Sequence, residues 1–247
     1  MDRILSIPFE PVTYDFSEFA RVKEEVGDNG IIMYSINDAV GNCFGMMEFG
    51  EATVWALTEP EHFEKTVRTL HERIMENLRC VLEYNAFDLI RIVGAENMTI
   101  PYMPPALCDR FWKPCVKEMV DLIHSKGCKT RIHSHGNIRD SLPMFIETGA
   151  DALDPVEAPP DGNITLGEVK EMTKGRMCLF GNIQPRVMEY GTEKEIREAV
   201  KRCMDEAKSD GGFVIMPTSA PLERKLPKKI EENYFAFIDA ALEYGRY

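Results

Sequence analysis

Short apolar runs alternate with longer segments of helical periodicity along the whole chain. The runs cover residues 30–36, 87–94, 128–135, 151–157, 177–183 and 212–218, with a weaker one, ILSI, at 4–7. Between them, apolar residues recur every three to four positions, which is typical of amphipathic helices. Strands this short that alternate with helices predict βαβ units and a parallel sheet, and therefore an α/β fold.

Several of the predicted helices have recognisable ends. Thr58–Glu61 has the pattern of a capping box before an apolar helix face, and the pattern recurs at Thr165–Glu168 and Thr192–Glu195. One helix is expected through residues 107–123, with Gly127 as its stop, and a last amphipathic helix around residues 230–242.

Polar residues follow nearly every predicted strand. They are Asn37–Asp38, Glu96–Asn97, His133–Asn137, Glu157, Asn182–Pro185 and Thr218–Ser219. A Rossmann-type open sheet would need a Gly-rich turn after its first strand, and the sequence has none there. Chemistry gathered at the carboxyl ends of many strands is typical of barrel enzymes. We therefore expect a single domain over residues 1–247, a (β/α)8 TIM-type barrel. Six convincing strands, or seven with ILSI, would leave it N-terminally shortened or incomplete.

Composition narrows the classes of partner. The 247 residues are 44% hydrophobic and carry a formal net charge of -12, which disfavours nucleic acid as the main partner but still allows a local basic pocket. The sequence contains no run of 18 or more apolar residues, so it predicts no membrane-spanning helix. The first residues lack the apolar core of a signal peptide. The seven cysteines form no CxxC pair, and Cys80, Cys115 and Cys203 lie in apolar-periodic stretches, as buried, reduced thiols do. We expect a cytoplasmic protein.

Two histidines one residue apart form the clearest chemical signal. In RIHSHGN (131–137), His133 and His135 would share one face of a strand, and their ring nitrogens could converge on a metal ion at about 2.0–2.1 Å. The alternative is a hydrogen-bonded pair that lines a polar pocket. Arg131 shares the face of His133 and would need a carboxylate partner there. His62, His71 and His124 are expected at the surface.

Further metal ligands would have to be oxygen atoms, because no cysteine directly follows a predicted strand. Glu157 and Glu96 are the candidates, since both stand at strand ends. For each, the alternative role is a carboxylate that pairs with an arginine or caps a loop.

Several stretches, in order, resemble the uroporphyrinogen decarboxylase superfamily, which includes cobalamin-dependent methyltransferases. The resemblance extends from about residue 88 to 245, and more weakly through YSINDAVG and GEATVWALTEPEHFEKT in the N-terminal part. The matching stretches are GAEN (94–97), PPALCDRFWKPCVKEMVDLIHSKG (104–127), HSHGN (133–137), FGNIQP (180–185) and YGTEKEIREAVKRCMDEA (190–207). The resemblance implies a (β/α)8 barrel.

Departures from the family pattern favour its methyltransferases. The decarboxylases hold their polycarboxylate substrate with an arginine-rich N-terminal loop, whereas residues 1–30 contain only Arg3 and Arg21. The methyltransferases hold zinc through a His, a Cys and a later Cys. Here His133 stands at the first position, His135 replaces the first Cys, and Ser219 in MPTSAP replaces the second.

The resemblance thus implies a zinc-dependent methyltransferase that moves a methyl group between a corrinoid (a cobalamin carried by a partner protein) and a small acceptor. The expected metal ligands are His133, His135 and Glu157. The expected catalytic residues are Glu96, Asn182 and Ser219, and the expected substrate contacts are Asn137, Glu157 and Gln184. The alternative role for Asn182 is a hydrogen bond to the backbone of the turn before Pro185.

Two other functions stay open. One is decarboxylation of uroporphyrinogen or of a smaller carboxylic acid, and the other is a non-catalytic, degenerate barrel subunit. The family's barrel has N-terminal strands upstream of the segment that aligns here. We therefore expect either a truncated or minimal member, or a partner chain that covers the exposed sheet edge, for which a homodimer would suffice.

Overall fold

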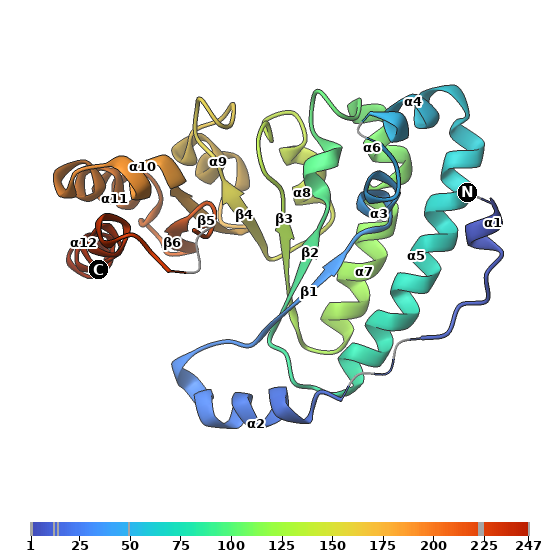
Figure 1. The fold of residues 1–247 in the computed structure, drawn as a ribbon, viewed down its shortest axis with the longest axis horizontal. Helices are drawn as coiled ribbons and strands as arrows, with labels where there is room; N and C mark the ends of the chain where they lie inside the picture. The colour runs from blue at the N-terminus through green and yellow to red at the C-terminus, as the bar shows by residue number, and fades with distance from the viewer. Residues whose placement is uncertain (1, 12, 14, 49, 222–224, 247) are drawn as a thin grey trace. The chain divides into compact units, whose positions relative to one another are not determined.

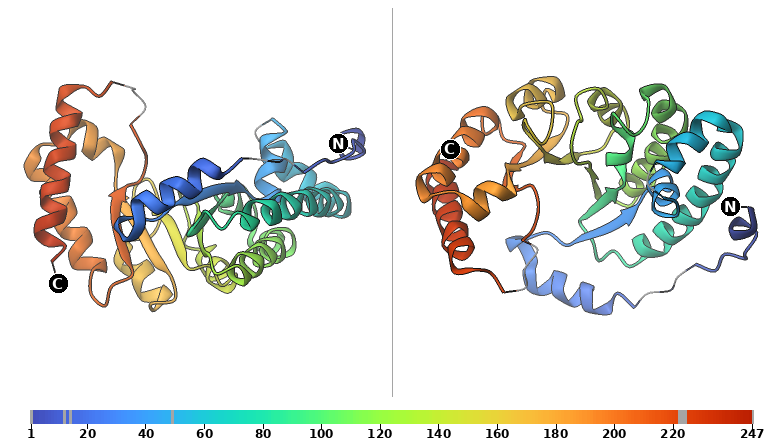
Figure 2. Two further views of the ribbon diagram at one scale, coloured as in Figure 1. Left: turned by 90° about the horizontal axis from the view of Figure 1, so that it is seen from below. Right: turned by 45° about the horizontal axis from the view of Figure 1, so that its top comes forward.

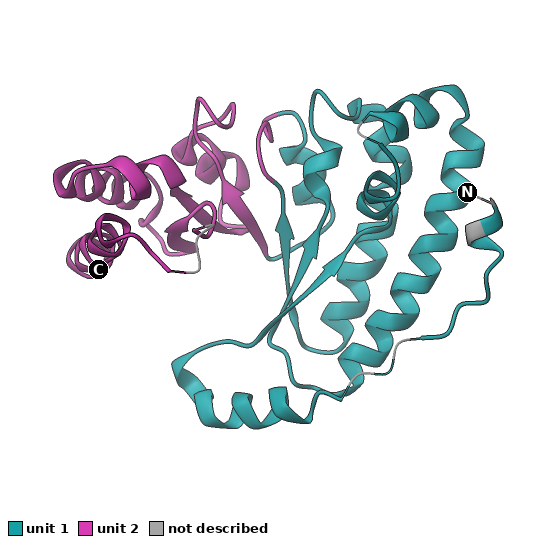
Figure 3. Ribbon diagram, in the orientation of Figure 1, with its two compact units in different colours: residues 1–134, 140–151 teal, residues 135–139, 152–247 magenta. Residues whose placement is uncertain are grey.

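The chain forms two compact units in the computed structural model, which describes residues 2–11, 13, 15–48, 50–221 and 225–246. Unit 1 comprises residues 1–134 and 140–151, and unit 2 comprises residues 135–139 and 152–247 (Figure 3). Strands alternate with helices in both units (Figure 1), which confirms the predicted α/β class. The single domain over residues 1–247 stays a prediction.

Unit 1 is built on a parallel sheet of three strands within the described residues. They are β1 (Met33–Asn37), β2 (Leu89–Val93) and β3 (Lys129–His133), and all three lie within predicted runs or within one residue of them. Ile90, Ile92 and Ile132 are fully buried on one face of this sheet. The long helices α5 (Pro60–Glu83) and α7 (Lys113–Ser125) lie side by side, and α7 packs against β3 (Figure 1). The other elements of unit 1 are α1 (Asp2–Leu5), α2 (Ser17–Val26), η1 (Gly27–Asn29), α3 (Ala39–Gly45), α4 (Glu51–Thr58), η2 (Ala95–Met98), α6 (Pro105–Phe111) and α8 (Leu142–Glu147).

Unit 2 repeats this plan with a second set of three parallel strands in the described residues. They are β4 (Ala152–Val156), β5 (Cys178–Ile183) and β6 (Phe213–Pro217), each within its predicted run. The helices are α9 (Leu166–Thr173), α10 (Pro185–Tyr190), α11 (Glu193–Ala207) and α12 (Lys228–Tyr244). Figure 2 shows α11 and α12 lying side by side.

Two predicted capping boxes are confirmed in unit 2. Thr165 accepts a hydrogen bond from the Glu168 backbone N–H, and the Glu168 carboxylate in turn accepts one from the Thr165 backbone N–H. Thr192 and Glu195 do the same at the start of α11. Each box satisfies backbone donors that a helix N-terminus leaves without partners.

Three predictions about local structure were wrong. The ILSI run does not form a strand, because residues 2–5 form the short helix α1. Thr58 caps nothing: it ends α4, where its hydroxyl donates to the carbonyl of Val54, and α5 begins at Pro60. The helix expected through residues 107–123 is broken into α6 and α7 at Trp112, just before Pro114, which lacks the N–H that a continuous helix would need.

A buried histidine corrects a fourth prediction. His71 is only 2% exposed, because it follows Val67 by four positions on the apolar face of α5. Its Nε2 lies 2.8 Å from Glu118 Oε2 of α7, and Arg68 Nη1 donates to the other carboxylate oxygen at 2.9 Å. Burial lowers the pKa of His71, and the Glu118 carboxylate offsets only part of that effect. The contact ties the two long helices of unit 1 together.

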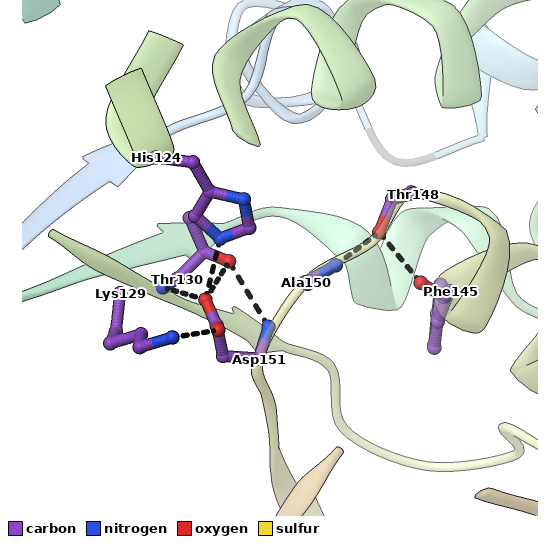
Figure 4. Close-up of polar contacts among 7 residues, drawn as sticks. All are labelled: His124, Lys129, Thr130, Phe145, Thr148, Ala150 and Asp151. Carbon is purple, nitrogen blue, oxygen red and sulfur yellow. Dashed lines mark hydrogen bonds and ion pairs between the residues drawn. The ribbon is translucent and has the colours of Figure 1, made fainter. Parts of the chain in front are cut away.

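A carboxylate fixes the start of β3. Asp151 accepts hydrogen bonds from the Thr130 backbone N–H at 2.8 Å, from His124 Nε2 at 2.7 Å and from Lys129 Nζ at 2.9 Å (Figure 4). Burial would raise the pKa of Asp151, but these donors outweigh it and lower the pKa to about 2. Figure 4 also shows Thr148 joining the end of α8 to the backbone of Ala150. This network lies at the amino end of β3, away from the strand end that carries His133.

All seven cysteines fall within the described residues and are free thiols. Cys115 and Cys203 are buried as predicted, whereas Cys80 is half-buried. Across the part of the chain that the structure describes, no helix combines the length and the apolar composition that crossing a membrane requires.

Candidate functional site

The strand that carries His133 ends at that residue. The β2–β3 register closes with Val93 opposite His133, and Gly136 then turns the backbone at φ +80°. The prediction that one strand continues to His135 was therefore wrong, and the shared-face argument does not hold. His133 belongs to unit 1 and His135 to unit 2.

His133 is held by a guanidinium. It is 8% exposed, and Arg91 Nη2 lies 2.6 Å from its Nδ1. Because arginine can only donate, Nδ1 is an acceptor, and the ring is the neutral tautomer with its proton on Nε2. Neither nitrogen then offers a lone pair to a metal ion, and the adjacent guanidinium would repel a dication. His133 does not fit the predicted role of zinc ligand as it lies here.

His135 is held by a carboxylate instead. Its Nδ1 lies 3.3 Å from Glu157 Oε1, while Glu157 Oε2 accepts the Gly136 backbone N–H at 2.7 Å. Burial would raise the pKa of Glu157, but the bonds from His135 and Gly136 outweigh it and hold the pKa below its ordinary value. Glu157 is therefore ionised at neutral pH. When His135 donates its Nδ1–H to this carboxylate, Nε2 becomes the nitrogen that carries the lone pair.

Tight backbone packing fixes the His135–Glu157 pair. A Cβ on Gly162 would lie 2.0 Å from the carbonyl oxygen of Glu157 and 3.0 Å from that of Gly136, so only glycine fits at this position. Arg139 anchors the same short segment, since its backbone N–H donates to Asn163 Oδ1 and its Nη2 donates to Glu168 Oε1 at 2.6 Å. The backbone segments that carry His135 and Glu157 are therefore both held in place by these contacts.

The side chains present do not supply the predicted zinc ligands. Among the described residues, no group of three or more His, Cys, Asp or Glu side chains gathers as a metal site. His135 has the tautomer that a metal-bound histidine with a carboxylate partner adopts. Glu157, however, uses one oxygen for His135 and the other for Gly136, so it orients the histidine rather than acting as a ligand. Zinc binding stays a prediction, for which the residues that the structure describes offer no fitting donor set.

Glu96 lies in unit 1, in the short helix η2 after β2. It is half-buried, and within the described structure its Oε2 has no hydrogen-bond partner. Nearby Asp38 is fully buried and accepts bonds from the Gly41 N–H at 2.7 Å and from Trp112 Nε1 at 2.8 Å. Burial, aided by the charge of Glu96, raises the pKa of Asp38 to about 6 despite these bonds. Asp38 caps α3 and is not exposed to any ligand.

The remaining predicted residues lie in unit 2. Asn182 is 4% exposed, and its Oδ1 accepts a hydrogen bond from Cys203 Sγ of α11 at 3.3 Å. Its Nδ2 has no hydrogen-bond partner within the described structure, so the predicted role of Asn182 as a hydrogen-bond donor to the substrate stays a prediction. Ser219 is exposed and donates to the carbonyl of Ala220. Asn137 is exposed beside Gly136, and Gln184 is buried at the start of α10.

Thr218 is a site residue to which the sequence assigned no role. It is 3% exposed at the end of β6, and its hydroxyl contributes to the lowered pKa of Glu157. In the sequence, only its position directly after a predicted strand indicated that Thr218 could belong to a site. Of the predicted residues, unit 2 thus brings together His135 and Glu157, with Thr218 beside them.

Comparison with known proteins adds a family match for most of the chain. The model of the family described as "Uroporphyrinogen decarboxylase (URO-D)" matches residues 19–244. A uroporphyrinogen decarboxylase from Acinetobacter baumannii is 37% identical over 70 residues, which are 28% of this chain and 18% of the decarboxylase.

Two solved structures share the fold. A methyltransferase from Methanosarcina mazei superposes with a TM-score of 0.72 at 18% identity, over 92% of this chain and 63% of its own. A D-psicose 3-epimerase superposes with a TM-score of 0.54 at 14% identity, over 94% and 86%. At such identities the likeness shows the fold alone, which is that of the TIM-barrel class. The matched region thus spans less than a fifth of the decarboxylase and under two thirds of the methyltransferase.

Proposed function

Because the chain belongs to the uroporphyrinogen decarboxylase family, we propose that it is a methyltransferase of that superfamily and that His135 and Glu157 are its acid–base pair. In this proposal, a small acceptor with a thiol or phenol group loses its proton as it takes the methyl group. The family's namesake and its relatives are enzymes by name, which supports a catalytic role over a purely structural subunit.

The geometry of the His135–Glu157 pair carries the proposal. A carboxylate on Nδ1 sets the tautomer in which Nε2 can accept a proton, and it stabilises the imidazolium that forms. The His135 side chain is 40% exposed, so an acceptor can reach it, whereas Glu157 is 12% exposed and shielded. The acceptor's X–H proton moves to Nε2 of His135, its electron pair forms the bond to the methyl carbon, and the donor keeps the pair of the broken bond.

The donor in this proposal is a corrinoid carried by a partner protein, as the sequence resemblance implies. Zinc is not included, because Glu157 orients His135 and His133 is held by Arg91. A homodimer and a cytoplasmic location accompany the proposal as expectations from the sequence.

Demethylation of methylcobalamin by the purified chain tests this function. With a panel of thiols and phenols, we expect loss of the methylcobalamin absorbance. His135→Ala should slow the reaction by about 100-fold or more, since that is the usual contribution of a positioned base. Glu157→Gln should slow it less and shift the rate–pH profile, because the amide leaves the ring oriented but without a charge beside the imidazolium.

His62→Ala is the matched control. His62 lies on α5 with its side chain 35% exposed and near Glu59, so this change should leave the rate unaltered. Unaltered rates in the His135 and Glu157 variants would contradict the proposal, as would the absence of turnover with every acceptor.

A decarboxylase is the second candidate. The 37% identity to a named uroporphyrinogen decarboxylase over 70 residues favours it. Release of CO2 from uroporphyrinogen or from smaller carboxylic acids, with no effect of the chain on methylcobalamin, would establish this alternative in place of methyl transfer.

A further inference from the structure

We infer that two copies of this chain associate through α12, with the two helices antiparallel. The contact surface is an exposed apolar stripe on this helix, formed by Phe235, Ile238 and Leu242 and here called the α12 stripe. The sequence predicted a homodimer only as a cover for a sheet edge, whereas this inference assigns the contact to a helix face. It goes beyond the proposed function and does not depend on it.

Apolar side chains lie on two faces of α12. One face packs against α10 and α11 and contains the buried residues Asn233, Ala236, Phe237 and Ala240. The α12 stripe lies on another face, because Phe235, Ile238 and Leu242 follow one another at intervals of three and four positions. These three side chains are 61%, 46% and 66% exposed. A surface helix normally carries polar residues away from its core, so such a stripe marks a contact surface for a second helix.

The charges at the two ends of the α12 stripe fit a second copy of the same helix. Glu231 stands four positions before Phe235, and Arg246 stands four positions after Leu242. Gly245 keeps a nearly helical backbone, with φ -78° and ψ -4°, so Arg246 continues the face of the stripe beyond the end of α12. The stripe thus begins with an anion and ends with a cation, and both residues are exposed.

An antiparallel pairing matches each part of this pattern with its complement. When the two-fold axis passes close to Ile238, Phe235 of one copy lies opposite Leu242 of the other, and Glu231 lies opposite Arg246. An ion pair then flanks the apolar contact at each end, whereas a parallel pairing would bring like charges together. A surface that is self-complementary about a two-fold axis is what a closed homodimer needs.

Asp239 opposes the contact. It follows Ile238 directly and is exposed, so in the antiparallel pair the two Asp239 carboxylates would lie near the two-fold axis and repel each other. A contact made by one helix from each copy is also small. We therefore expect reversible association in the micromolar range, which neutralisation of Asp239 should strengthen.

Analytical ultracentrifugation across micromolar chain concentrations tests the contact. The intact chain should form a reversible dimer. Ile238→Gln should weaken the dimer by about tenfold or more, because both copies lose the apolar side chain at the centre of the contact. Asp239→Asn should strengthen it by about twofold or more, because the repulsion near the axis is removed. Both positions are exposed and both changes alter helix propensity little, so circular dichroism should show an intact fold.

A charge exchange tests the antiparallel pairing itself. Glu231→Arg and Arg246→Glu should each weaken the dimer by about threefold or more, since each change places like charges opposite one another at both ends. The double variant restores both ion pairs with their ends exchanged, so it should recover most of the affinity of the intact chain. A double variant that dimerises no better than the single variants would overturn the inference.

Tyr190→Gln is the matched control. Tyr190 is 80% exposed on α10, in the same unit but outside the α12 stripe, so its loss should leave the dimer unchanged. Equal weakening in this control would reduce the effect to general surface hydrophobicity and overturn the inference. A chain that stays monomeric at every concentration would also overturn it, as would a dimer that Ile238→Gln leaves intact.

Discussion

His133 and His135 are separated by one residue in the sequence, yet they have opposite electrostatic partners. In unit 1, the Arg91 guanidinium donates to Nδ1 of His133 and makes it an acceptor. In unit 2, the Glu157 carboxylate lies beside Nδ1 of His135 and makes it a donor. The partner of a histidine, rather than its spacing, therefore decides which nitrogen can react.

The difference separates two kinds of chemistry. A ring whose Nδ1 already accepts from a guanidinium is a poor proton acceptor, because that nitrogen is occupied and a second positive charge beside the cation is unfavourable. A ring beside an anion suits proton removal, because the carboxylate stabilises the imidazolium. The proposed acid–base role therefore falls to His135 and not to His133, and the same change made at each histidine should have different consequences.

The strongest test of this contrast replaces each histidine with glutamine. In His133→Gln, the amide oxygen retains an acceptor for Arg91, so this variant should keep the rate of methyl transfer within about threefold. In His135→Gln, the amide cannot take a proton, so the reaction should slow by about 100-fold. Methylcobalamin consumption at saturating acceptor gives both numbers, and equal losses would remove the distinction between the two rings.

A second test breaks the backbone support that is specific to unit 2. Gly162→Ala should destabilise the chain by about 1–3 kcal/mol, because the new methyl group would overlap the carbonyl of Glu157. Gly167→Ala in α9 is the control, since its nearest neighbour would be 3.7 Å away and alanine favours helix. Urea denaturation of both variants measures the difference. A Gly162→Ala chain as stable as the control would show that the segment relaxes freely.

Acid should affect unit 1 through Asp151. Its pKa falls from about 3.8 in the unfolded chain to about 2 in the folded one, so the folded state binds fewer protons between these values. The resulting stabilisation, about 2 kcal/mol, is present above pH 4 and is lost as the pH falls through 2. Asp151→Asn should remove that part of the pH dependence, as urea midpoints between pH 5 and pH 2 would show. An unchanged slope in the variant would assign acid sensitivity to other groups.

The smallest expected effect belongs to His71. Burial lowers its pKa below the ordinary 6.5, so the folded state resists protonation that the unfolded chain accepts. Stability should therefore decline slightly as the pH falls from 6.5 toward the lowered pKa. His71→Gln keeps a donor for Glu118 but does not titrate, and its urea midpoint should vary less between pH 7.5 and pH 5.5. An identical decline in the variant would contradict this origin.

The strands and two capping boxes could be predicted because their signals are local. Alternating apolar runs give β1 to β6, and Thr165 and Thr192 each find their capping glutamate three residues later. Thr58 shows the limit of such patterns. The same motif ends a helix there, because the preceding residues of α4 already offer a carbonyl to its hydroxyl.

The candidate site was only partly predictable because its decisive contacts join distant residues. The sequence identified His135 and Glu157, but it could not show that the carboxylate would orient the ring. Arg91 is 42 residues from His133, and no local pattern indicates that contact. The hydrogen bond from Cys203 Sγ to Asn182 Oδ1 likewise joins two residues that are 21 positions apart, one in α11 and one in β5.

The free thiols offer an independent view of how each half of the molecule opens. Burial raises the pKa of Cys43, Cys108 and Cys115 in unit 1 to about 12 and that of Cys203 in unit 2 to about 11, so none of them reacts readily at neutral pH while folded. Alkylation followed by peptide mass spectrometry would measure the rate at which each thiol becomes accessible to solvent. A single protein sample would thereby report the unfolding rates of unit 1 and unit 2 separately, without any introduced label.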